Sequence, residues 1–253
     1  DDTYQADNTS IASQGHVLGP VILAFDITER EGGERTRREF TANVSHELKT
    51  PLQGILGSAE LLENGLVKSE DVPRFVGHIR SEAQRLMALI GDIIRLSQLD
   101  EGEEMPREDV DLLEVARRAA EQLDTTAQAR KIAVTVDGQP TAVNGVRQLL
   151  YEVIYNLCDN AIKYNVDGGS VRMTVSGDGA NACVTVADTG IGIPLEQQAR
   201  VFERFYRVDK SHSKASGGTG LGLSIVKHAV QYHGGSISLT SRPGEGTTVR
   251  VWL

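Results

Sequence analysis

The stretch "NVSHELKTPL", residues 43–52, combines residue types that helix packing alone does not require. The apolar residues Val44 and Leu48 are one helical turn apart. His46 lies between them, about 200° around a helix from each, and so it faces solvent. A neutral imidazole, with an unperturbed pKa of ~6.5, is a nucleophile near pH 7. Glu47 can accept the proton of the second ring nitrogen and take up the charge that develops during attack. The alternative is an ordinary surface histidine.

Two later residues of this stretch, Thr50 and Pro51, favour a chemical role for this imidazole. Thr50 is four residues after His46, so its hydroxyl shares the helix face and can position a group beside the ring. The hydroxyl is uncharged and cannot act as a general base near pH 7, but it can hold a water molecule. Pro51 removes a backbone donor and disfavours helical geometry at Thr50, which predicts a bend at this place. We expect a nucleophile to which another part of the chain brings an electrophile.

The stretch "YEVIYNLCDNAIKYN", residues 151–165, predicts a helix with one apolar and one polar face. The polar face carries Glu152, Asn156, Asn160, Lys163 and Tyr164 at spacings of three and four. Asparagine is a poor helix former, so two of them on one face argue against a merely solvated face, which is the alternative. Their amide oxygens suit a magnesium ion that also binds phosphates, and the lysine can bind a phosphate oxygen.

The segment "DTGIGIP", residues 188–194, places an acid and two glycines after a predicted strand. The carboxylate of Asp188 can accept a hydrogen bond from the exocyclic amine of adenine, whereas guanine presents a carbonyl at that edge. Gly190 and Gly192 allow the backbone to approach a flat base. An ordinary Asp-Gly turn is the alternative.

The segment "GGTGLGLSIVKHAV", residues 217–230, places Gly218, Gly220 and Gly222 at the start of a helix, where backbone N–H groups bind anions. The spacing G-x-G-x-G follows a polar stretch instead of a strand, which excludes a dinucleotide fingerprint, and the chain has no P-loop. The polar stretch 208–218 predicts a mobile lid over a nucleotide.

The segment "FERFYR", residues 202–207, precedes this lid. It supplies Arg204 and Arg207 as candidate phosphate ligands, and its aromatic residues as anchors for the lid.

Two long helices must carry the first of these motifs. Apolar residues recur at steps of three and four from Phe40 to Leu66 and again from Val72 to Leu99, interrupted by "NGLVKSEDVP". An antiparallel hairpin with one apolar stripe on each helix cannot bury both stripes alone. Pairing of two hairpins into a four-helix bundle solves this, so the pattern predicts a homodimer. Packing against the rest of the same chain is the alternative.

The remaining motifs fall in a part of the chain with mixed helices and strands. After an acidic linker at 101–110, helices are expected at about 111–129 and 144–164 and from about 220. Strands are expected at 131–136, 170–176, 182–188, 235–241 and 247–253. This pattern predicts an α+β two-layer sandwich over residues 111–253, with helices on one face of a mixed sheet.

The N-terminal part of the chain is harder to assign. Residues 1–16 are polar and are expected to be irregular, and 17–28 read as the last strand of a domain upstream, so that 1–28 would be its remnant. A charged linker is expected at 29–39, because its two adjacent glycines weaken a helix by ~1 kcal/mol each. The chain begins with Asp and is expected to be a piece of something longer.

Composition narrows the functional classes. The 253 residues suffice for one large domain or two ordinary ones, and the net charge of −9 argues against non-specific binding to nucleic acid or to an anionic membrane. Cys158 and Cys183 lie in apolar surroundings and are expected to be reduced core residues, a disulfide being the less favoured alternative. The apolar run "VLGPVILAF" is far shorter than the ~20 residues that span a bilayer, so no membrane segment is expected in this fragment.

Together and in this order, the motifs resemble those of bacterial sensor histidine kinases, over about residues 35–253. "FTANVSHELKTPL" resembles the H box, "NLCDNAIKYN" the N box, "DTGIGIP" the G1 box, "FERFYR" the F box and "GGTGLGLS" the G2 box, and "GEGTTV" resembles a last glycine element. "ILAFDITER" resembles the end of a PAS sensor domain, and "NVSHELKTP" is similar to the phosphate- and envelope-sensing group. The resemblance implies a phosphotransfer hairpin at 40–100 followed by an ATP-binding domain of the GHKL (Bergerat) fold.

The resemblance also implies a role for each matching residue. His46 would be the phospho-acceptor, with Glu47 as its base or orienting partner, and Thr50 would serve dephosphorylation of a partner. Asn156 and Asn160 would hold Mg²⁺, Asp188 would bind the adenine of ATP, and Thr247 would lie close to it. The other nucleotide-binding positions would be Lys163, Tyr164, Gly190, Gly192, Ile193, Arg204, Arg207, Gly218, Thr219, Gly220, Leu221 and Gly222.

The activity implied is autophosphorylation of His46 by ATP, followed by transfer to an aspartate of a response-regulator receiver domain. The longer protein would be anchored in the bacterial inner membrane. Two alternatives stay open: a GHKL ATPase that uses Glu152 as the base for a water molecule, and a dimeric scaffold that binds nucleotide without turnover.

Overall fold

The computed structural model describes residues 4–13, 16–26, 28–177, 181–208 and 218–253. The chain forms two compact units, Asp1–Gln53 and Gly54–Leu253, which are described separately. Most of the predicted lid, residues 209–217, lies outside the described residues.

The first unit begins with a strand pair. β1 (Tyr4–Ser13) runs antiparallel to β2 (His16–Asp26), with Tyr4 opposite Asp26. The strand predicted at 17–28 is present as far as Asp26, but the expectation that residues 1–16 are irregular was wrong for Tyr4–Ser13 and for His16. The hydrogen bonds of an antiparallel ladder join backbone groups, so a polar sequence can form a strand once a partner strand is beside it.

The helix α1 (Thr28–Glu63) follows directly and begins earlier than predicted. The segment 29–39, expected to be a linker, is helical, with Gly32 and Gly33 inside it. A glycine lowers helix stability locally, but each residue added to an existing helix gains a hydrogen bond without a new nucleation cost. Pro51 also lies within α1, and the helix continues past it.

The second unit contains the end of α1 and the whole of α2 (Val72–Glu101), joined by the predicted break. The Ser58 hydroxyl lies 3.1 Å from Nδ1 of His78, so the last turns of α1 contact the first turns of α2. α2 ends at Gly102, which adopts the left-handed conformation that glycine favours.

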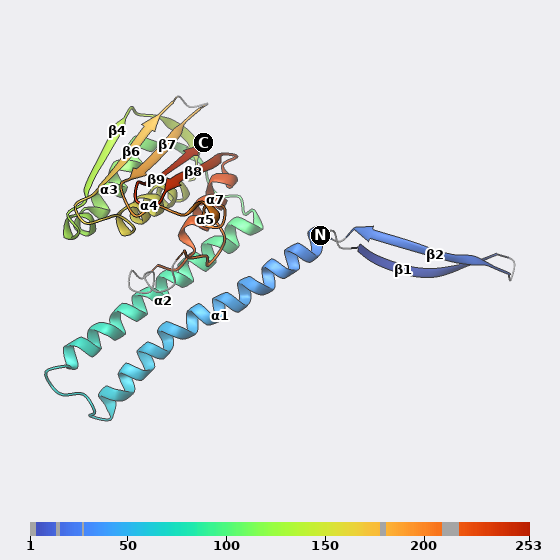
Figure 1. The fold of residues 1–253 in the computed structure, drawn as a ribbon, viewed down its shortest axis with the longest axis horizontal. Coiled ribbons are helices and arrows are strands. Elements are labelled where there is room, and N and C mark those ends of the chain that lie inside the picture. Colours follow the sequence, from blue (N-terminus) through green and yellow to red (C-terminus); the bar gives the residue numbers. More distant parts are fainter. Residues whose placement is uncertain (1–3, 14–15, 27, 178–180, 209–217) are drawn as a thin grey trace. The chain divides into compact units, whose positions relative to one another are not determined.

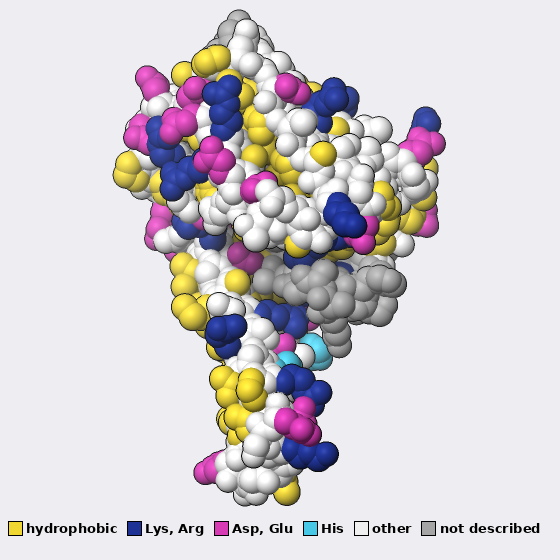
Figure 2. Space-filling view, turned by 90° about the vertical axis from the view of Figure 1, so that its left-hand side faces the viewer, with side chains coloured by type: hydrophobic (Ala, Val, Ile, Leu, Met, Phe, Trp, Pro, Cys, Tyr) yellow, Lys and Arg dark blue, Asp and Glu magenta, His cyan; other side chains and the backbone are white. Residues whose placement is uncertain are grey.

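The hydrophobic side chains of α2 differ in how far they are buried. Leu89, Leu96 and Leu99 are buried, whereas Val72, Val76, Met87, Ile90 and Ile94 are exposed. Hydrophobic side chains accordingly appear on the surface of the helical hairpin in Figure 2. No helix among the described residues is both long and apolar enough to cross a membrane.

The rest of the second unit is built on a five-stranded sheet with the strand order β4-β6-β7-β9-β8. Its strands are β4 (Ala133–Gly138), β6 (Ser170–Ser176), β7 (Cys183–Asp188), β8 (Ser236–Arg242) and β9 (Gly246–Trp252). β4 and β6 are parallel and the other neighbours are antiparallel. The predicted mixed sheet is thus confirmed.

Helices cover one face of this sheet. Val171, Met173 and Val175 of β6 are buried, whereas Arg172 between them is exposed, as expected where alternate side chains point to opposite faces. α3 (Leu112–Ala129) packs on β4, α4 (Arg147–Lys163) on β6 and β7, and α7 (Gly222–Tyr232) on β8. The predicted two-layer sandwich is confirmed, with α4 between the other two helices (Figure 1).

Three short elements were not predicted. β3 (Glu108–Asp111) lies where only a linker was expected and pairs with β5 (Ala142–Gly145), and α5 (Leu195–Gln198) is a single turn. The helix expected from residue 144 begins at Arg147, because residues 142–145 belong to β5. Strands of four residues are too short for a clear periodic pattern.

Asp111 connects β3, β5 and α3, and this suggests a test of the fold. Its Oδ1 accepts hydrogen bonds from the backbone N–H of Leu113 (3.0 Å), as the N-cap of α3, and of Thr141 (3.1 Å). We predict that Asp111→Ala lowers the free energy of unfolding by ~1–2 kcal/mol in urea denaturation, because an N-cap is lost. Asp109→Ala, at an exposed position of the same strand, is the control, and an equal effect of both would contradict the assignment.

Candidate active site

The polar side of α4 faces the glycine-rich start of α7. The opposite side of α4 is buried in the core, including Val153, Ile154 and Leu157. Nδ2 of Asn156 donates to the Glu152 carbonyl (2.8 Å). Its Oδ1 lies so close to Gly222 that a Cβ there would be 2.9 Å away.

Two turns further along α4 than Asn156, Lys163 lies beside the same glycine-rich segment. A Cβ on Gly218 would lie 3.6 Å from Nζ of Lys163, which itself is 3.8 Å from Oδ2 of Asp159. Asn160 lies between the two positions and is half-buried, and Tyr164, at the end of the helix, is exposed. The structure thus brings the predicted N-box and G2-box residues together.

Asp188 ends β7 and begins a turn that has no room for a side chain at Gly190 or Gly192. Its Oδ1 accepts from the backbone N–H of Gly190 (2.7 Å) and of Thr247 (3.2 Å). Burial raises the pKa of this carboxyl group, and the two N–H donors oppose that shift. A Cβ on Gly190 would overlap the Tyr164 carbonyl oxygen, and a Cβ on Gly192, which has φ +69°, would overlap that of Arg242. Both glycines are therefore required by close backbone approach.

Thr247 joins the same cluster through β8. Its hydroxyl lies 2.9 Å from Oγ of Ser241, and that oxygen also accepts from the backbone N–H of Ile193 (2.8 Å). The ends of β7, β8 and β9 thereby converge around Asp188, and the structure brings together Asp188 and Thr247, which the resemblance places near one adenine.

The F-box and G2-box segments pack on one another. The Gly220 carbonyl accepts from the backbone N–H of Phe205 (2.9 Å), and Arg207 donates to the carbonyl of Gly218. Gly220 has φ +76°, a conformation that glycine adopts readily. Leu221 is fully buried and anchors the segment before α7 begins.

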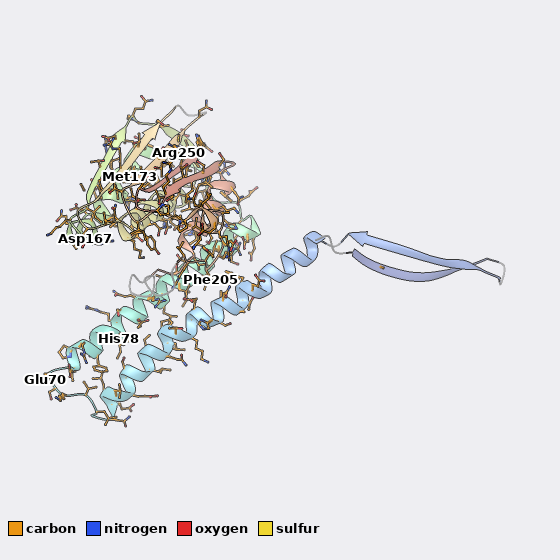
Figure 3. All side chains as sticks on the ribbon, in the orientation of Figure 1. Glu70, His78, Asp167, Met173, Phe205 and Arg250 are labelled. Carbon is orange, nitrogen blue, oxygen red and sulfur yellow. The ribbon has the colours of Figure 1, made fainter. Side chains whose placement is uncertain are left out.

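Side chains of α2 also reach this region, which the sequence did not indicate. Thr219 donates to Oδ2 of Asp92 (2.7 Å), and Arg204 donates to Oδ1 of Asp100 (2.6 Å). Burial raises the pKa of the Asp92 carboxyl, and its hydrogen bond with Thr219 opposes that shift. Phe205, next to Arg204, lies at this contact with α2 (Figure 3).

A further contact, an ion pair, joins α2 to α4: Nη2 of Arg95 lies 2.8 Å from Oε1 of Glu152. Asp92, Arg95 and Asp100 recur along α2, so a polar stripe could have been recognised in the sequence. The partners of this stripe in the nucleotide motifs could not have been recognised, because no local sequence pattern identifies them.

The predicted nucleophile lies in the first unit. His46 and Thr50 are exposed on α1, and Glu47 is half-buried. The Thr50 hydroxyl donates to the His46 carbonyl at 3.4 Å, which places the two residues on one helix face, as predicted. The functional roles of all these residues stay predictions.

This fold and these motifs define a class: an ATP-binding domain preceded by a phosphotransfer hairpin. Residues 145–253 match the family described as "Histidine kinase-, DNA gyrase B-, and HSP90-like ATPase", and residues 36–102 match "His Kinase A (phospho-acceptor) domain". The chain belongs to the histidine kinase family.

Similar proteins and structures agree with this assignment. The sensor-like histidine kinase SenX3 of Mycolicibacterium smegmatis is 43% identical over 235 residues, which are 90% of this chain and 60% of that protein. WalK of Bacillus subtilis is 35% identical over 244 residues, 94% of this chain and 40% of that protein. The chain thus spans only part of the length of these relatives.

Among solved structures, the mycobacterial sensor histidine kinase MprB is 32% identical with a TM-score of 0.52, covering 58% of this chain and 97% of that one. Histidine kinase ThkA in complex with the response regulator TrrA has a TM-score of 0.67 at 23% identity, covering 99% and 74%, and it shows likeness of fold.

The position of Asp188 suggests a test of base recognition. We predict that Asp188→Asn weakens ADP binding ~10-fold or more, because a charge-assisted hydrogen bond is worth ~1.5–3 kcal/mol. Discrimination against GDP should fall as well, since an amide presents either a donor or an acceptor. Calorimetry with both nucleotides measures this, with Asp137→Asn on the exposed part of β4 as control. Unchanged ADP affinity with continued exclusion of GDP would remove Asp188 as the adenine reader.

Proposed function

We propose that this chain is the kinase core of a two-component sensor histidine kinase. It phosphorylates His46 with ATP and passes the phosphoryl group to an aspartate of a response-regulator receiver domain. The observation that carries the proposal is the convergence of the N-box face of α4, the Asp188 turn and the start of α7 on one site, in a chain that also exposes an imidazole on α1.

In the proposed reaction, a ring nitrogen of His46 attacks the γ-phosphorus of ATP in line. A nitrogen–phosphorus bond forms as the bond from phosphorus to the β–γ bridging oxygen breaks, and ADP leaves. Glu47 accepts the proton of the other ring nitrogen. Because the protein mainly positions reactants and neutralises charge in phosphoryl transfer, Lys163 and Arg207 serve as phosphate ligands.

Arg204 is the third proposed phosphate ligand, and its ion pair with Asp100 limits its contact with a phosphate. Its guanidinium donates to Asp100 of α2 and lies 3.0 Å from Nε2 of His228. The Asp100 carboxylate therefore competes with a phosphate for Nη2 of Arg204.

The residues at the site also fit Mg²⁺. Asn156 and Asn160 offer amide oxygens, which are hard ligands suited to this ion. Oδ1 of Asn156 lies against Gly222 at the start of α7, where backbone N–H groups favour phosphate. Bound there, Mg²⁺ would neutralise charge on the transferring phosphates.

The environment of Glu152 favours a kinase over an ATPase. A hydrolytic GHKL enzyme would need this carboxylate as a base for water. Oε1 of Glu152 instead pairs with Nη2 of Arg95 (2.8 Å) and accepts from Nε2 of Gln148 (2.9 Å), so two donors of the protein already engage this carboxylate. Labelled ATP separates the alternatives: a kinase gives phosphoprotein, an ATPase gives free phosphate, and a scaffold gives neither.

The same proposal includes partners. The exposed apolar side chains of α2, including Met87, Ile90 and Ile94, support a homodimer in which two hairpins form a four-helix bundle. The complex of ThkA with TrrA supports a receiver domain as the second partner.

The proposal also assigns the parts of the chain. Residues 1–28 are the remnant of a PAS-like sensor domain, 40–100 the phosphotransfer domain and 111–253 the ATP-binding domain. We also propose that the longer protein is anchored in the bacterial inner membrane.

The central test of the proposal uses the nucleophile. We predict that ATP and Mg²⁺ yield a phosphoprotein stable to alkali and labile to acid, as a phosphoramidate is. His46→Gln should abolish the label and leave the Kd for ADP unchanged, because His46 lies outside the nucleotide motifs. His78→Gln, on α2, is the control and should still be labelled. Label that persists on His46→Gln would show that another residue is the acceptor.

Thr50 allows a separate test of regulator dephosphorylation. We predict that Thr50→Ala keeps the rate of His46 labelling within a few-fold but slows dephosphorylation of the regulator by one or two orders of magnitude, the range of a group that positions a water molecule. The alternative is that Thr50 only supports the helix before Pro51, in line with its hydrogen bond to the His46 carbonyl. Both rates are measured on one preparation, and parallel losses would favour the structural role.

A further inference from the structure

Arg130, outside every recognised motif, caps the end of the helix that carries the N box. It follows the last residue of α3, and its guanidinium reaches the C-terminus of α4. Nη1 donates to the carbonyls of Ile162 and Lys163, both at 2.7 Å, and Nη2 donates to that of Asn165, also at 2.7 Å. The last carbonyls of a helix have no partner within it and carry a partial negative charge. One planar cation thus contacts three carbonyls at the end of α4, of which that of Ile162 also accepts from the backbone N–H of Asn165 (3.3 Å).

The turn held by Arg130 is the surface against which the G1 segment packs. The Tyr164 carbonyl accepts from the backbone N–H of Ile191 (3.0 Å). A Cβ on Gly190 would overlap that same oxygen and would lie 3.0 Å from Cα of Asn165. The backbone of residues 164–165 thus sets how closely the loop after Asp188 can approach.

Asn165 links the turn to β6 and to the G1 segment a second time. It is only 4% exposed, and its Nδ2 donates to the Ser170 carbonyl (3.0 Å). Its Oδ1 accepts from the Val166 N–H (3.0 Å) and from the hydroxyl of Thr189 (3.3 Å). Thr189 is the residue between Asp188 and Gly190. Tyr164 and Asn165 therefore both contact the segment that follows Asp188.

The chain of contacts ends at the Asp188 carboxylate. Gly190, positioned by the Tyr164 carbonyl, donates its N–H to Oδ1 of Asp188 at 2.7 Å. A displacement of residues 162–165 would therefore move the donor that orients this carboxylate. We propose that Arg130 is a positioning residue for adenine binding, acting through the end of α4 and the G1 segment on Asp188. This inference rests on the proposed role of Asp188.

The ion pair of Arg130 does not account for its place in the fold. Its only carboxylate partner among the described residues is Asp167, at 3.3 Å, whose side chain is 81% exposed and lies at the edge of the domain (Figure 3). Exposed ion pairs contribute little. The three carbonyl contacts are specific to the guanidinium fork, which a lysine ammonium cannot reproduce.

The test compares variants of Arg130 and its neighbours in the full 253-residue chain. We predict that Arg130→Gln raises the Kd for ADP, measured by calorimetry, and the KM for ATP about tenfold. The kcat for His46 labelling at saturating ATP should stay within about threefold, because the base is read in the ground state as well as in the transition state. Arg130→Lys should show a comparable loss of affinity. Asp167→Asn removes only the exposed pair, and Arg172→Gln removes an exposed arginine of β6; both should stay within twofold of the unmodified chain.

Thermal melting of each variant separates positioning from stability. An Arg130→Gln variant that melts at lower temperature but binds ADP normally would overturn the inference, and so would full recovery of affinity in Arg130→Lys. The proposed function fails in a different way: the unmodified chain would give no labelled His46, or Asp188→Asn would leave ADP binding unchanged. Weaker ADP binding in Asp188→Asn together with normal binding in Arg130→Gln overturns only the role of Arg130.

Discussion

Burial of one face of α4 is the constraint on which the candidate site depends. Leu150, Val153, Ile154 and Leu157 are almost fully buried, with α3 and α7 on either side and β6 and β7 beneath. Each such side chain contributes ~1.5–3 kcal/mol when it leaves water, so rotation of α4 about its axis would be costly. With one face held in the core, the amides and Lys163 on the other face can only point toward the start of α7.

Around this helix, the site is assembled from close approaches of backbone rather than from a set of side chains. Gly190 and Gly192 leave no space for a Cβ, and the Asp188 carboxylate is held by two backbone N–H groups. Such contacts give little freedom to the loop, because moving any one segment breaks a hydrogen bond or creates a steric overlap. The part of the site that would read the base is therefore rigid.

The contacts of α2 have a direct electrostatic consequence. Asp92 and Asp100 bind Thr219 and Arg204, two positions that the motifs assign to the nucleotide. A carboxylate and a phosphate compete for the same donors, since both are anionic hydrogen-bond acceptors. In this structure, α2, the second helix of the proposed phosphotransfer hairpin, therefore occupies part of the proposed phosphate-binding set. The proposed binding of phosphate by these two residues would therefore compete with their contacts to α2.

The sequence by itself determined the class of fold, the family and the candidate ligands, because these depend on local patterns. Apolar periodicity marked α2, α4 and most strands, and glycines at fixed spacing marked turns that only glycine can form. The local patterns did not reveal β1, β3 and β5, where pairing with a neighbouring strand outweighs a weak local preference. They also did not reveal that 29–39 is helical, because there an existing helix continues through unfavourable residues.

Only the tertiary structure showed that Arg130 caps α4 and that Asp92 meets Thr219. Arg130 is 32 or more residues away in the chain from the carbonyls that it contacts. Asp92 and Thr219 are 127 residues apart. A pairing of that kind leaves no periodic signal in either segment. It arises only when burial of the core has set the distance between them.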